Sequence, residues 1–254
     1  MCSIIILYRP GHDWPVLIAA NRDEMVSRLW RVPGRHWPDR PTVVAGLDEL
    51  AGGAWLGLND HGVMATILNR VGTLGPVEGK RSRGELVLNA LDHADAGTAV
   101  RAVCALDPIA YRPFNILVAD GHGAYWLCYQ ENEAERMIQA WPIPPGLSML
   151  TALDLNDRRD PRLRDHWPIF AAAPFPRPES GEWSAWQALL ASHTFAPDAG
   201  PKGAMCFMTE NGFGTTSSSL MALPAPHRLR WPIWLFADGP PDRADYKPVA
   251  PFTP

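Results

Sequence analysis

The sequence predicts an α+β protein in which two antiparallel sheets lie face to face between outer helices, a four-layer αββα sandwich. Short apolar and β-branched segments alternate with helical ones in the order strands, helices, strands, helices, strands, which differs from a regular strand–helix alternation. Neither Gly-x-Gly-x-x-Gly nor Gly-x-x-x-x-Gly-Lys-Ser/Thr occurs, and this argues against a nucleotide-binding fold. We expect the 254 residues to form one domain.

The first 70 residues read as a succession of strands. Ser3–Tyr8 is short and apolar, a turn is expected at Pro10, and Val16–Asn21 follows as a partner strand. The pair Gly52-Gly53 is interpreted as a tight bend between strands. Further strands are expected at Thr42–Leu47, Ala54–Asn59 and Val63–Asn69, the last two joined by an Asp-His-Gly hairpin turn.

The middle of the chain predicts helices. Ser82 and Glu85 have the spacing of a capping box, in front of apolar residues at helical intervals, and a second helix is expected over Thr98–Leu106. A Pro-rich arm from about residue 240 is expected to lie extended on the surface. The other predicted elements are strands at Phe114–Ala119, Ala124–Gln130 and Arg136–Trp141, helices at 161–173 and 182–192, and strands at Ala204–Thr209, Thr216–Leu223 and Arg228–Phe236.

Composition excludes several classes of function. A net charge of -4 gives no electrostatic case for nucleic acid or an anionic membrane surface. No apolar run approaches the roughly 20 residues of a membrane span, and no secretory leader is recognised, so we expect a soluble cytoplasmic protein. The cysteines stand at positions 2, 104, 128 and 206 without a Cys-x-x-Cys pair, and the eight histidines are dispersed. These spacings predict no disulfide, no metal site and no cofactor.

Cys2 is the candidate nucleophile. A small residue after Met1 makes removal of the initiator methionine feasible, which would leave Cys2 first in the chain with a free α-amine. An α-amine has a pKa of about 7.7–8.0 and a thiol of about 8.5. One residue would then carry both nucleophile and base, as in enzymes with a terminal threonine. Any protein can have cysteine second, so this position alone is weak evidence.

The segment Asn21-Arg22-Asp23-Glu24 follows an apolar strand without a break. In a hairpin that pairs residue 7 with residue 17, Cys2 stands opposite Arg22. An aspartate there could hold and orient the α-ammonium, and an arginine could favour the thiolate. The alternative is a solvated strand end that carries three charges.

The chain resembles a known family through several motifs in order. They cover about the first 90 residues and are Met1-Cys2, Asn21-Arg22-Asp23-Glu24, Gly52-Gly53-Ala54-Trp55-Leu56-Gly57, Asn69 and Arg83-Gly84-Glu85-Leu86-Val87. They are similar to the NRDE family, also called the transport and Golgi organisation protein family. That family resembles the N-terminal-nucleophile (Ntn) hydrolases of the choloylglycine hydrolase and penicillin V acylase type.

The resemblance implies roles for individual residues. It implies Cys2 as nucleophile, Asp23 as partner of its amine, Arg22 near the sulfur, and Asn69 as oxyanion donor. An amide NH₂ at the end of an apolar strand suits that last role, and the alternative for Asn69 is a hairpin-end residue that bonds its own backbone. The residues expected to line the substrate pocket are Asn21, Trp55 and Asn59, and packing is the alternative for the tryptophan.

Two departures from the acylases concern expected polar groups. Thr216 stands where the acylases have an arginine, and Ala152 stands where they have an asparagine, with Asn156 as a substitute. In addition, Arg22 and Asp23 are adjacent, and adjacent strand residues face opposite sides unless the strand bends.

Two functions therefore remain open. The first is a cysteine hydrolase that acts on a non-peptide amide or other small acyl compound through a thioester on Cys2. The second is a non-catalytic binding or trafficking protein on the same scaffold, with haem or an acyl lipid as the ligand that the family implies. The oligomeric state stays open, with a homo-oligomer among the options.

Overall fold

The computed structural model describes residues 2–131, 136–228 and 230–249, and it divides into two compact units that each contain one antiparallel sheet. Among the described residues, unit 1 comprises 2–28, Pro145–Pro224 and Pro232–Val249. Unit 2 comprises Leu29–Pro144 and Ala225–Trp231. Both units therefore combine segments that are far apart in the sequence. The α+β class with two antiparallel sheets is confirmed.

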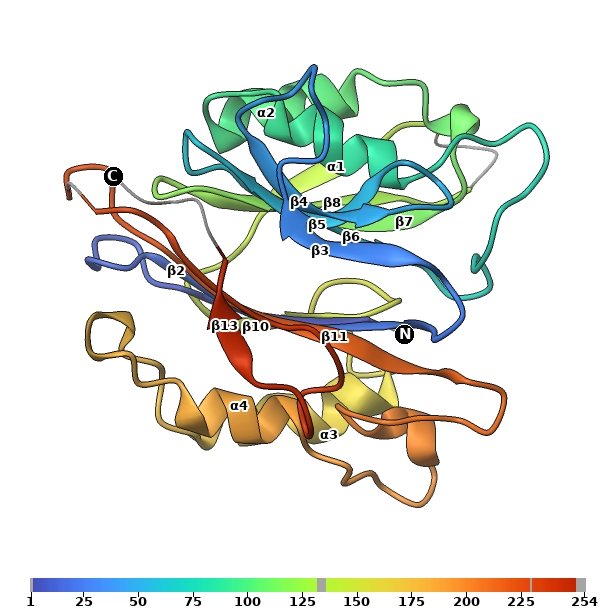
Figure 1. Cartoon of the computed structure of the whole chain (residues 1–254), viewed down its shortest axis with the longest axis vertical. Helices are drawn as coiled ribbons and strands as arrows, with labels where there is room; N and C mark the ends of the chain where they lie inside the picture. Colours follow the sequence, from blue (N-terminus) through green and yellow to red (C-terminus); the bar gives the residue numbers. More distant parts are fainter. Residues whose placement is uncertain (1, 132–135, 229, 250–254) are drawn as a thin grey trace. The chain divides into compact units, whose positions relative to one another are not determined.

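The sheet of unit 1 has the strand order β10-β1-β2-β11-β12-β13. Its strands are β1 (Ser3–Tyr8), β2 (Val16–Met25), β10 (Gly146–Leu150), β11 (Phe213–Leu223), β12 (Ile233–Ala237) and β13 (Tyr246–Pro248). Its helices are α3 (Pro161–Ala172) and α4 (Ser184–Leu190), with short 3₁₀ turns η2 (Pro178–Ser180) and η3 (Pro201–Gly203). Both α-helices lie on the same side of this sheet, where α3 contacts β10 and α4 contacts β2 (Figure 1).

The sheet of unit 2 follows the sequence, in the order β3-β4-β5-β6-β7-β8-β9. Its strands are β3 (Trp30–Gly34), β4 (Val43–Asp48), β5 (Ala54–Asn59), β6 (Met64–Asn69), β7 (Phe114–Ala119), β8 (Ala124–Tyr129) and β9 (Gln139–Pro142). One face is covered by α1 (Gly84–Leu91), which contacts β5, and by α2 (Ala96–Cys104), which contacts β8; η1 (Pro108–Ala110) follows them.

Each unit buries an apolar core between its own sheet and helices. In unit 1, Ile5 and Leu7 of β1 and Leu17 and Ala19 of β2 pack with Phe170 of α3. Since side chains alternate along a strand, every second residue of β1 and β2 faces the helices. The core of unit 2 joins residues of β4 to those of α1 and α2 in the same way.

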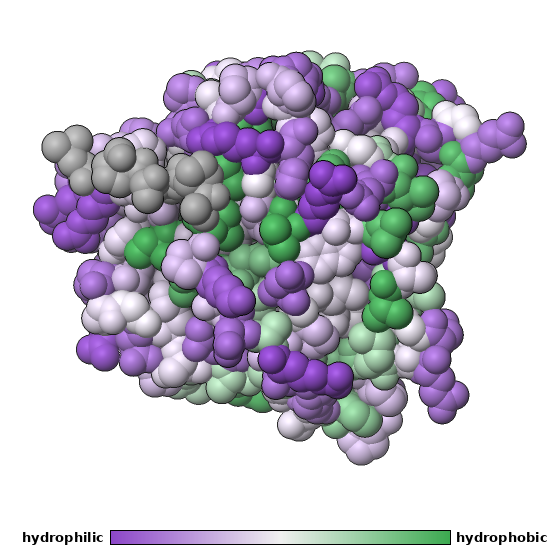
Figure 2. Space-filling view, viewed as in Figure 1, coloured by the Kyte–Doolittle hydropathy of each residue, from purple (hydrophilic) through white to green (hydrophobic). Residues whose placement is uncertain are grey.

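The surface is mixed in character. On the face shown in Figure 2, hydrophilic residues lie interspersed with apolar ones. None of the helices in the described part of the chain is both long and apolar enough to cross a membrane.

Several predicted elements are confirmed and others are wrong. The strands β1, β5 and β7 have the predicted bounds, whereas β3, β10 and β13 were not predicted. The predicted strand Ala204–Thr209 forms only an isolated bridge between Met208 and Gly214. The predicted extended arm contains β13, which pairs with β12, and residues 250–254 lie outside the described residues.

The predicted capping box of α1 is also wrong. The N-cap is Arg83, without a side-chain cap bond. The Ser82 hydroxyl accepts a hydrogen bond from the Gly84 amide, and Glu85 pairs with Arg81 instead of reaching back to the cap. The second helix begins earlier than predicted because Asp95 caps it, accepting from the Thr98 amide.

The adjacent glycines 52 and 53 serve two different purposes. Gly52 has φ +70°, a left-handed conformation that suits the predicted bend before β5. Gly53 lies against the start of α1, where a Cβ would stand 2.6 Å from the Gly84 carbonyl carbon. The second glycine of this pair therefore permits a close backbone approach between the start of β5 and the start of α1.

This contact predicts unequal effects of two substitutions. We expect Gly53→Ala to destabilise the protein by about 1–3 kcal/mol, because the backbone of α1 must move away from the added methyl group. Gly52→Asn should cost about 1 kcal/mol or less, because asparagine tolerates the left-handed region and open space surrounds the position. Urea unfolding of both variants measures this difference, and equal losses would contradict the assignment.

Candidate active site

The pairing of β1 with β2 brings Cys2 to the centre of the candidate site. Leu7 pairs with Leu17 and Ser3 with Asn21, so the predicted register is confirmed. One step beyond this ladder, the Asp23 backbone N–H donates to the Cys2 Sγ at 3.4 Å. The thiol in turn lies 3.7 Å from the Asp23 carbonyl oxygen. A short local hairpin therefore holds the half-buried sulfur against the backbone of Asp23.

The Asp23 carboxylate is buried and firmly held. One oxygen lies 2.7 Å from the Nη1 of Arg162, in an ion pair whose two side chains are 4% and 0% exposed. The other oxygen accepts a hydrogen bond from the Thr215 hydroxyl at 2.8 Å. The buried cation and the hydroxyl donor therefore fix the position of the carboxylate, while the backbone of the same residue contacts Cys2.

Arg162 comes from α3 and serves several groups at once. Its Nη1 also donates to the Ser3 hydroxyl at 2.8 Å, and its Nη2 donates to the Lys202 carbonyl oxygen at 2.7 Å. The guanidinium lies over the Phe207 ring at 5.1 Å. Arg162 thus connects Asp23 to β1, to η3 and to the segment before β11 through its hydrogen bonds and its ring contact.

The start of α3 positions Arg162. Asp160 caps the helix by accepting from the backbone amides of Arg162 and Leu163, and its second oxygen accepts from the Thr151 hydroxyl. Pro161 at the first helical position suits this cap, since its missing N–H would have no partner there. The guanidinium therefore extends from a well-capped helix end.

Sequence reasoning missed Arg162, although a signal was present. Arg162, His166 and Phe170 are spaced four apart and all three are buried. A charged residue on the same helix face as a core phenylalanine is unusual, and it indicates a buried partner of opposite charge. The sequence could not identify that partner, since Asp23 is 139 residues away.

A β-bulge in β11 lies opposite Arg22 and Asp23. Along β11, Thr215 pairs with Asp23 and Ser217 pairs with Arg22, so Thr216 is the extra residue. The Arg22 Nη1 donates to the Thr216 hydroxyl at 3.2 Å, and that hydroxyl donates to the Arg22 carbonyl oxygen. The extra residue lies in β11, so the side chains of β2 keep their regular alternation. Thr216, where the acylases are expected to have arginine, contacts the arginine that this chain has.

Alternation along β2 decides which side chains share a face. Asn21 bonds the Leu190 carbonyl of α4, and Asp23 bonds Arg162 of α3, so both lie on the helix side of the sheet. Arg22 lies between them along the strand, so its side chain points to the other side of the sheet. Cys2 stands opposite Arg22 when the register is continued by one residue, so its side chain points to that side as well. Cys2 thus has the Arg22 guanidinium on its own face of the sheet and the Asp23 backbone beside it.

The surroundings raise the pKa of the Cys2 thiol. Burial is the main cause, and the Asp23 charge adds to it, while the Asp23 backbone N–H and the Arg22 charge act in the opposite direction. The resting thiol is accordingly protonated at neutral pH. A nucleophilic thiolate requires a base close by to take the proton.

Two predicted substrate-binding residues are part of the interior instead. The buried Asn21 amide donates to the carbonyls of Leu190 and Met205 and accepts from the Ser218 hydroxyl. Asn59 is also buried, and its side chain makes four hydrogen bonds within unit 2; the partners are Leu91, His93, His61 and Val63. These bonds use both N–H donors of each amide, which therefore hold the interior of their own units.

The remaining predicted residues lie in unit 2, except for Asn156. Asn69 is the last residue of β6, pairs with Phe114 and is half-buried. Trp55 packs edge-to-face on Trp30 at 5.5 Å, in line with a packing role. Asn156, in unit 1, has φ 61°. Its side chain accepts a hydrogen bond from the Met149 amide and donates one to the Ser148 hydroxyl, so it is held against β10.

Comparison with known proteins identifies relatives at two levels. The sequence model of the family described as Transport and Golgi organisation 2 matches residues 1–182, the part that contains Cys2, Asp23 and Arg162. No curated protein matches the chain in sequence.

Solved structures show the same fold at low identity. The Caenorhabditis elegans N-acylethanolamine-hydrolyzing acid amidase ortholog superposes with a TM-score of 0.54 at 13% identity, covering 89% of this chain and 94% of that one. A variant of the conjugated bile acid hydrolase from Clostridium perfringens gives a TM-score of 0.52 at 12% identity, covering 98% of this chain and 96% of that one. The fold is therefore of the Ntn-hydrolase type, as predicted.

Proposed function

Because the chain belongs to the Transport and Golgi organisation 2 family and has an Ntn-hydrolase fold, we propose that it is a cysteine hydrolase of small acyl amides, with Cys2 as nucleophile. The observation that carries the proposal is the contact between the Cys2 sulfur and the Asp23 backbone, beside a buried Asp23–Arg162 ion pair. The compartment proposed for the activity is the cytoplasm, where thiols stay reduced.

The chemistry begins with removal of Met1. The freed α-amine takes the thiol proton, and the sulfur attacks the carbonyl carbon of the amide to form a tetrahedral intermediate. The ammonium then gives that proton to the leaving nitrogen as the carbon–nitrogen bond breaks, which leaves a thioester on Cys2. Water attacks the thioester, the carbon–sulfur bond breaks, and the carboxylic acid and the thiol are released.

Three residues are proposed to support these steps. Asp23, held by Arg162 and Thr215, orients the ammonium form of the amine. Arg22 shares a sheet face with Cys2 and stabilises the thiolate. Asn69 is proposed as the donor to the oxyanion of the tetrahedral intermediate, a role that stays a prediction.

The proposed substrate class follows from the fold and the named relatives. The two solved relatives are named for hydrolysis of an N-acylethanolamine and of a conjugated bile acid, both amides of large apolar acyl groups. Amides with a long acyl chain and a small polar amine are therefore the first compounds to test.

The test is a mass-spectrometric search for an acyl adduct on Cys2. Processed protein is mixed with a panel of acyl amides and quenched in acid, and we expect one acyl group per chain on the N-terminal peptide, because the thioester must form before water resolves it. Cys104→Ser serves as the matched control, since Cys104 is a half-buried cysteine in unit 2.

The outcome separates the two candidate functions. Processed protein that forms no adduct and turns over no amide, with and without Cys2→Ala, would remove the hydrolase proposal. Saturable binding of haem or of a long-chain acyl lipid that survives Cys2→Ala would instead support a binding or trafficking protein. The same titrations in an analytical ultracentrifuge report whether the chain forms a homo-oligomer.

A further inference from the structure

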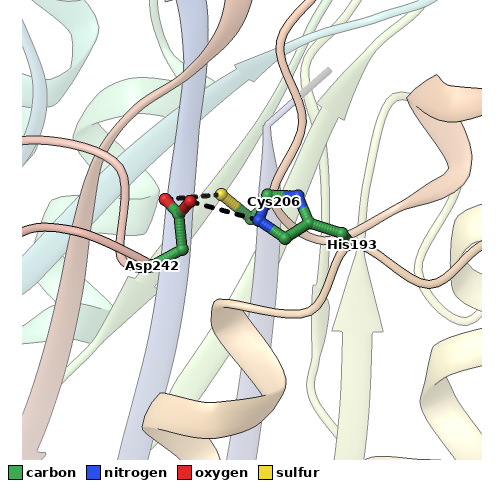
Figure 3. A group of neighbouring side chains, drawn as sticks. All are labelled: His193, Cys206 and Asp242. Carbon is green, nitrogen blue, oxygen red and sulfur yellow. Dashed lines mark hydrogen bonds and ion pairs between the residues drawn. The ribbon is translucent and has the colours of Figure 1, made fainter.

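A second group of chemically active side chains lies in unit 1, apart from the residues assigned to hydrolysis. His193 follows α4, Cys206 precedes β11, and Asp242 lies in the turn between β12 and β13. Figure 3 shows the three side chains pointing toward one another from these three segments. His193 and Asp242 are exposed, whereas Cys206 is buried beneath them.

The distances within this group suit a metal ion. The His193 Nε2 lies 3.1 Å from one Asp242 oxygen, the Cys206 Sγ lies 3.4 Å from the other, and all the ligand atoms lie within 4.8 Å of one another. Bonds of about 2.0–2.3 Å in a tetrahedral zinc site place ligand atoms roughly 3.3–3.8 Å apart. The three groups thus need only small side-chain rotations to surround one ion.

The backbone holds two of these ligands in place. The Cys206 N–H donates to the carbonyl oxygen of Ser192, the residue before His193, at 2.9 Å. Asp242 lies in a turn closed by bonds from the amides of Arg243 and Ala244 to the Pro240 carbonyl. Ligands that are fixed before binding lose little conformational entropy when they bind an ion.

The arrangement does not suit a second thiol nucleophile. In a Cys–His pair the imidazole must accept the thiol proton, but here the Cys206 thiol donates to Asp242 and His193 contacts the other oxygen of the same carboxylate. The buried Cys206 thiol therefore has no imidazole in position to take its proton, whereas a metal ion can replace that proton.

We propose that His193, Cys206 and Asp242 bind one divalent cation of the zinc type, which holds the turn before β13 against the segments that flank α4 and β11. A thiolate and an imidazole favour zinc over magnesium or calcium, which prefer oxygen ligands. As the sulfur–metal bond forms, the sulfur–hydrogen bond breaks and the proton passes to solvent. The exposed side of the site leaves a fourth position for water.

One neighbouring group must adjust when the ion binds. The Arg243 Nε lies 3.2 Å from an Asp242 oxygen, and its positive charge would repel a metal ion. The Arg243 side chain is 74% exposed, so it can turn into solvent without loss of buried contacts. Arg243→Ala is therefore expected to tighten metal binding.

The experiment uses the full chain after dialysis against a chelator. Zinc is added and its stoichiometry measured by elemental analysis, and cobalt(II) is then used as a spectroscopic probe. We expect one equivalent of zinc, and a thiolate-to-cobalt charge-transfer band with the strong visible absorption of a four-coordinate ion. Zinc at 100 times its dissociation constant should raise Tm by roughly 5–10 °C.

Single substitutions test which side chains bind the ion. Cys206→Ser should remove the charge-transfer band and weaken zinc binding at least about 100-fold, while Cys2→Ala and Cys104→Ser keep both. His193→Ala, at an exposed position where folding is safe, should weaken binding similarly. A band that persists in Cys206→Ser, a band that is lost in Cys2→Ala, or zinc binding well below one equivalent would each overturn the proposal. None of these readouts depends on amide hydrolysis, so the hydrolase proposal is tested separately.

Discussion

Inserting a single glycine between Met1 and Cys2 is expected to reduce amide hydrolysis by roughly 10²–10⁴-fold, although the thiol itself is kept. Removal of Met1 then leaves glycine first, and the α-amine is displaced by one residue from the sulfur that it should deprotonate. Because burial raises the pKa of Cys2, the thiol remains protonated without a base close by. Steady-state kinetics on the best amide of the panel, with the N-terminus verified by mass spectrometry, measures the effect.

Two further variants make this result specific. Cys2→Ala should abolish turnover, a loss of roughly 10⁴-fold or more, because no sulfur remains to form the thioester. Cys104→Ser, outside the site, should retain wild-type rates. Wild-type activity in the glycine insertion would show that the α-amine is not the base, and Cys2 would then need another proton acceptor.

Replacing Arg162 by methionine is expected to destabilise the protein by about 3–5 kcal/mol, because the buried Asp23 carboxylate loses its cation. Methionine has a similar length and is tolerated at the start of a helix, so the effect comes from the charge and the three polar contacts of Arg162. Urea unfolding gives the free energy, and exchange of the β2 amide hydrogens shows whether the loss lies in unit 1.

The same helix provides the matched control. Arg164 pairs with Asp165 and Asp198 at the surface, where solvent screens the charges, so Arg164→Ala should change stability far less than Arg162→Met. The double variant Asp23→Asn with Arg162→Met removes both charges and should recover part of the loss. A single-variant loss no larger than that of Arg164→Ala would mean that the buried pair does not hold Asp23 in place.

Measurements of stability and of turnover on the Arg162 variants also distinguish a structural role of Asp23 from a catalytic one. If Arg162 positions the carboxylate, then Arg162→Met should lower kcat even at temperatures where the variant is folded, and Arg162→Lys should restore part of it. A purely structural role would leave kcat unchanged in the folded protein. The pair of readouts therefore tests whether the ion pair belongs to the active site.

Local sequence patterns were sufficient to predict the hairpin that carries the proposed nucleophile. The turn at Pro10 and two apolar strands determine the pairing of Leu7 with Leu17, and that register alone brings Cys2 to Arg22 and Asp23. The α+β class could be predicted for the same reason, since each strand and helix is specified by the periodicity of its own residues.

Pairing between strands that are far apart in the sequence determined the strand bounds that local patterns did not predict. β2 continues through Arg22, Asp23 and Glu24 to Met25 because β11 pairs with its whole length, and no local preference predicts a strand through three charged residues. For the same reason β13 is a strand, since its residues pair with β12. Gly53 is required by the backbone of α1, which it meets only in the folded chain.

The chemistry of the molecule shows the same division. The sequence by itself predicted that Cys2 and Asp23 lie close together, because one hairpin joins them over a short stretch of chain. Only the tertiary structure decided that Arg162 neutralises Asp23, that Asn21 and Asn59 are interior residues, and that positions 193, 206 and 242 meet. Hydrogen bonds and ion pairs act over a few ångströms in space, and residue spacing along the chain reveals them only where one turn or one strand pair connects the partners.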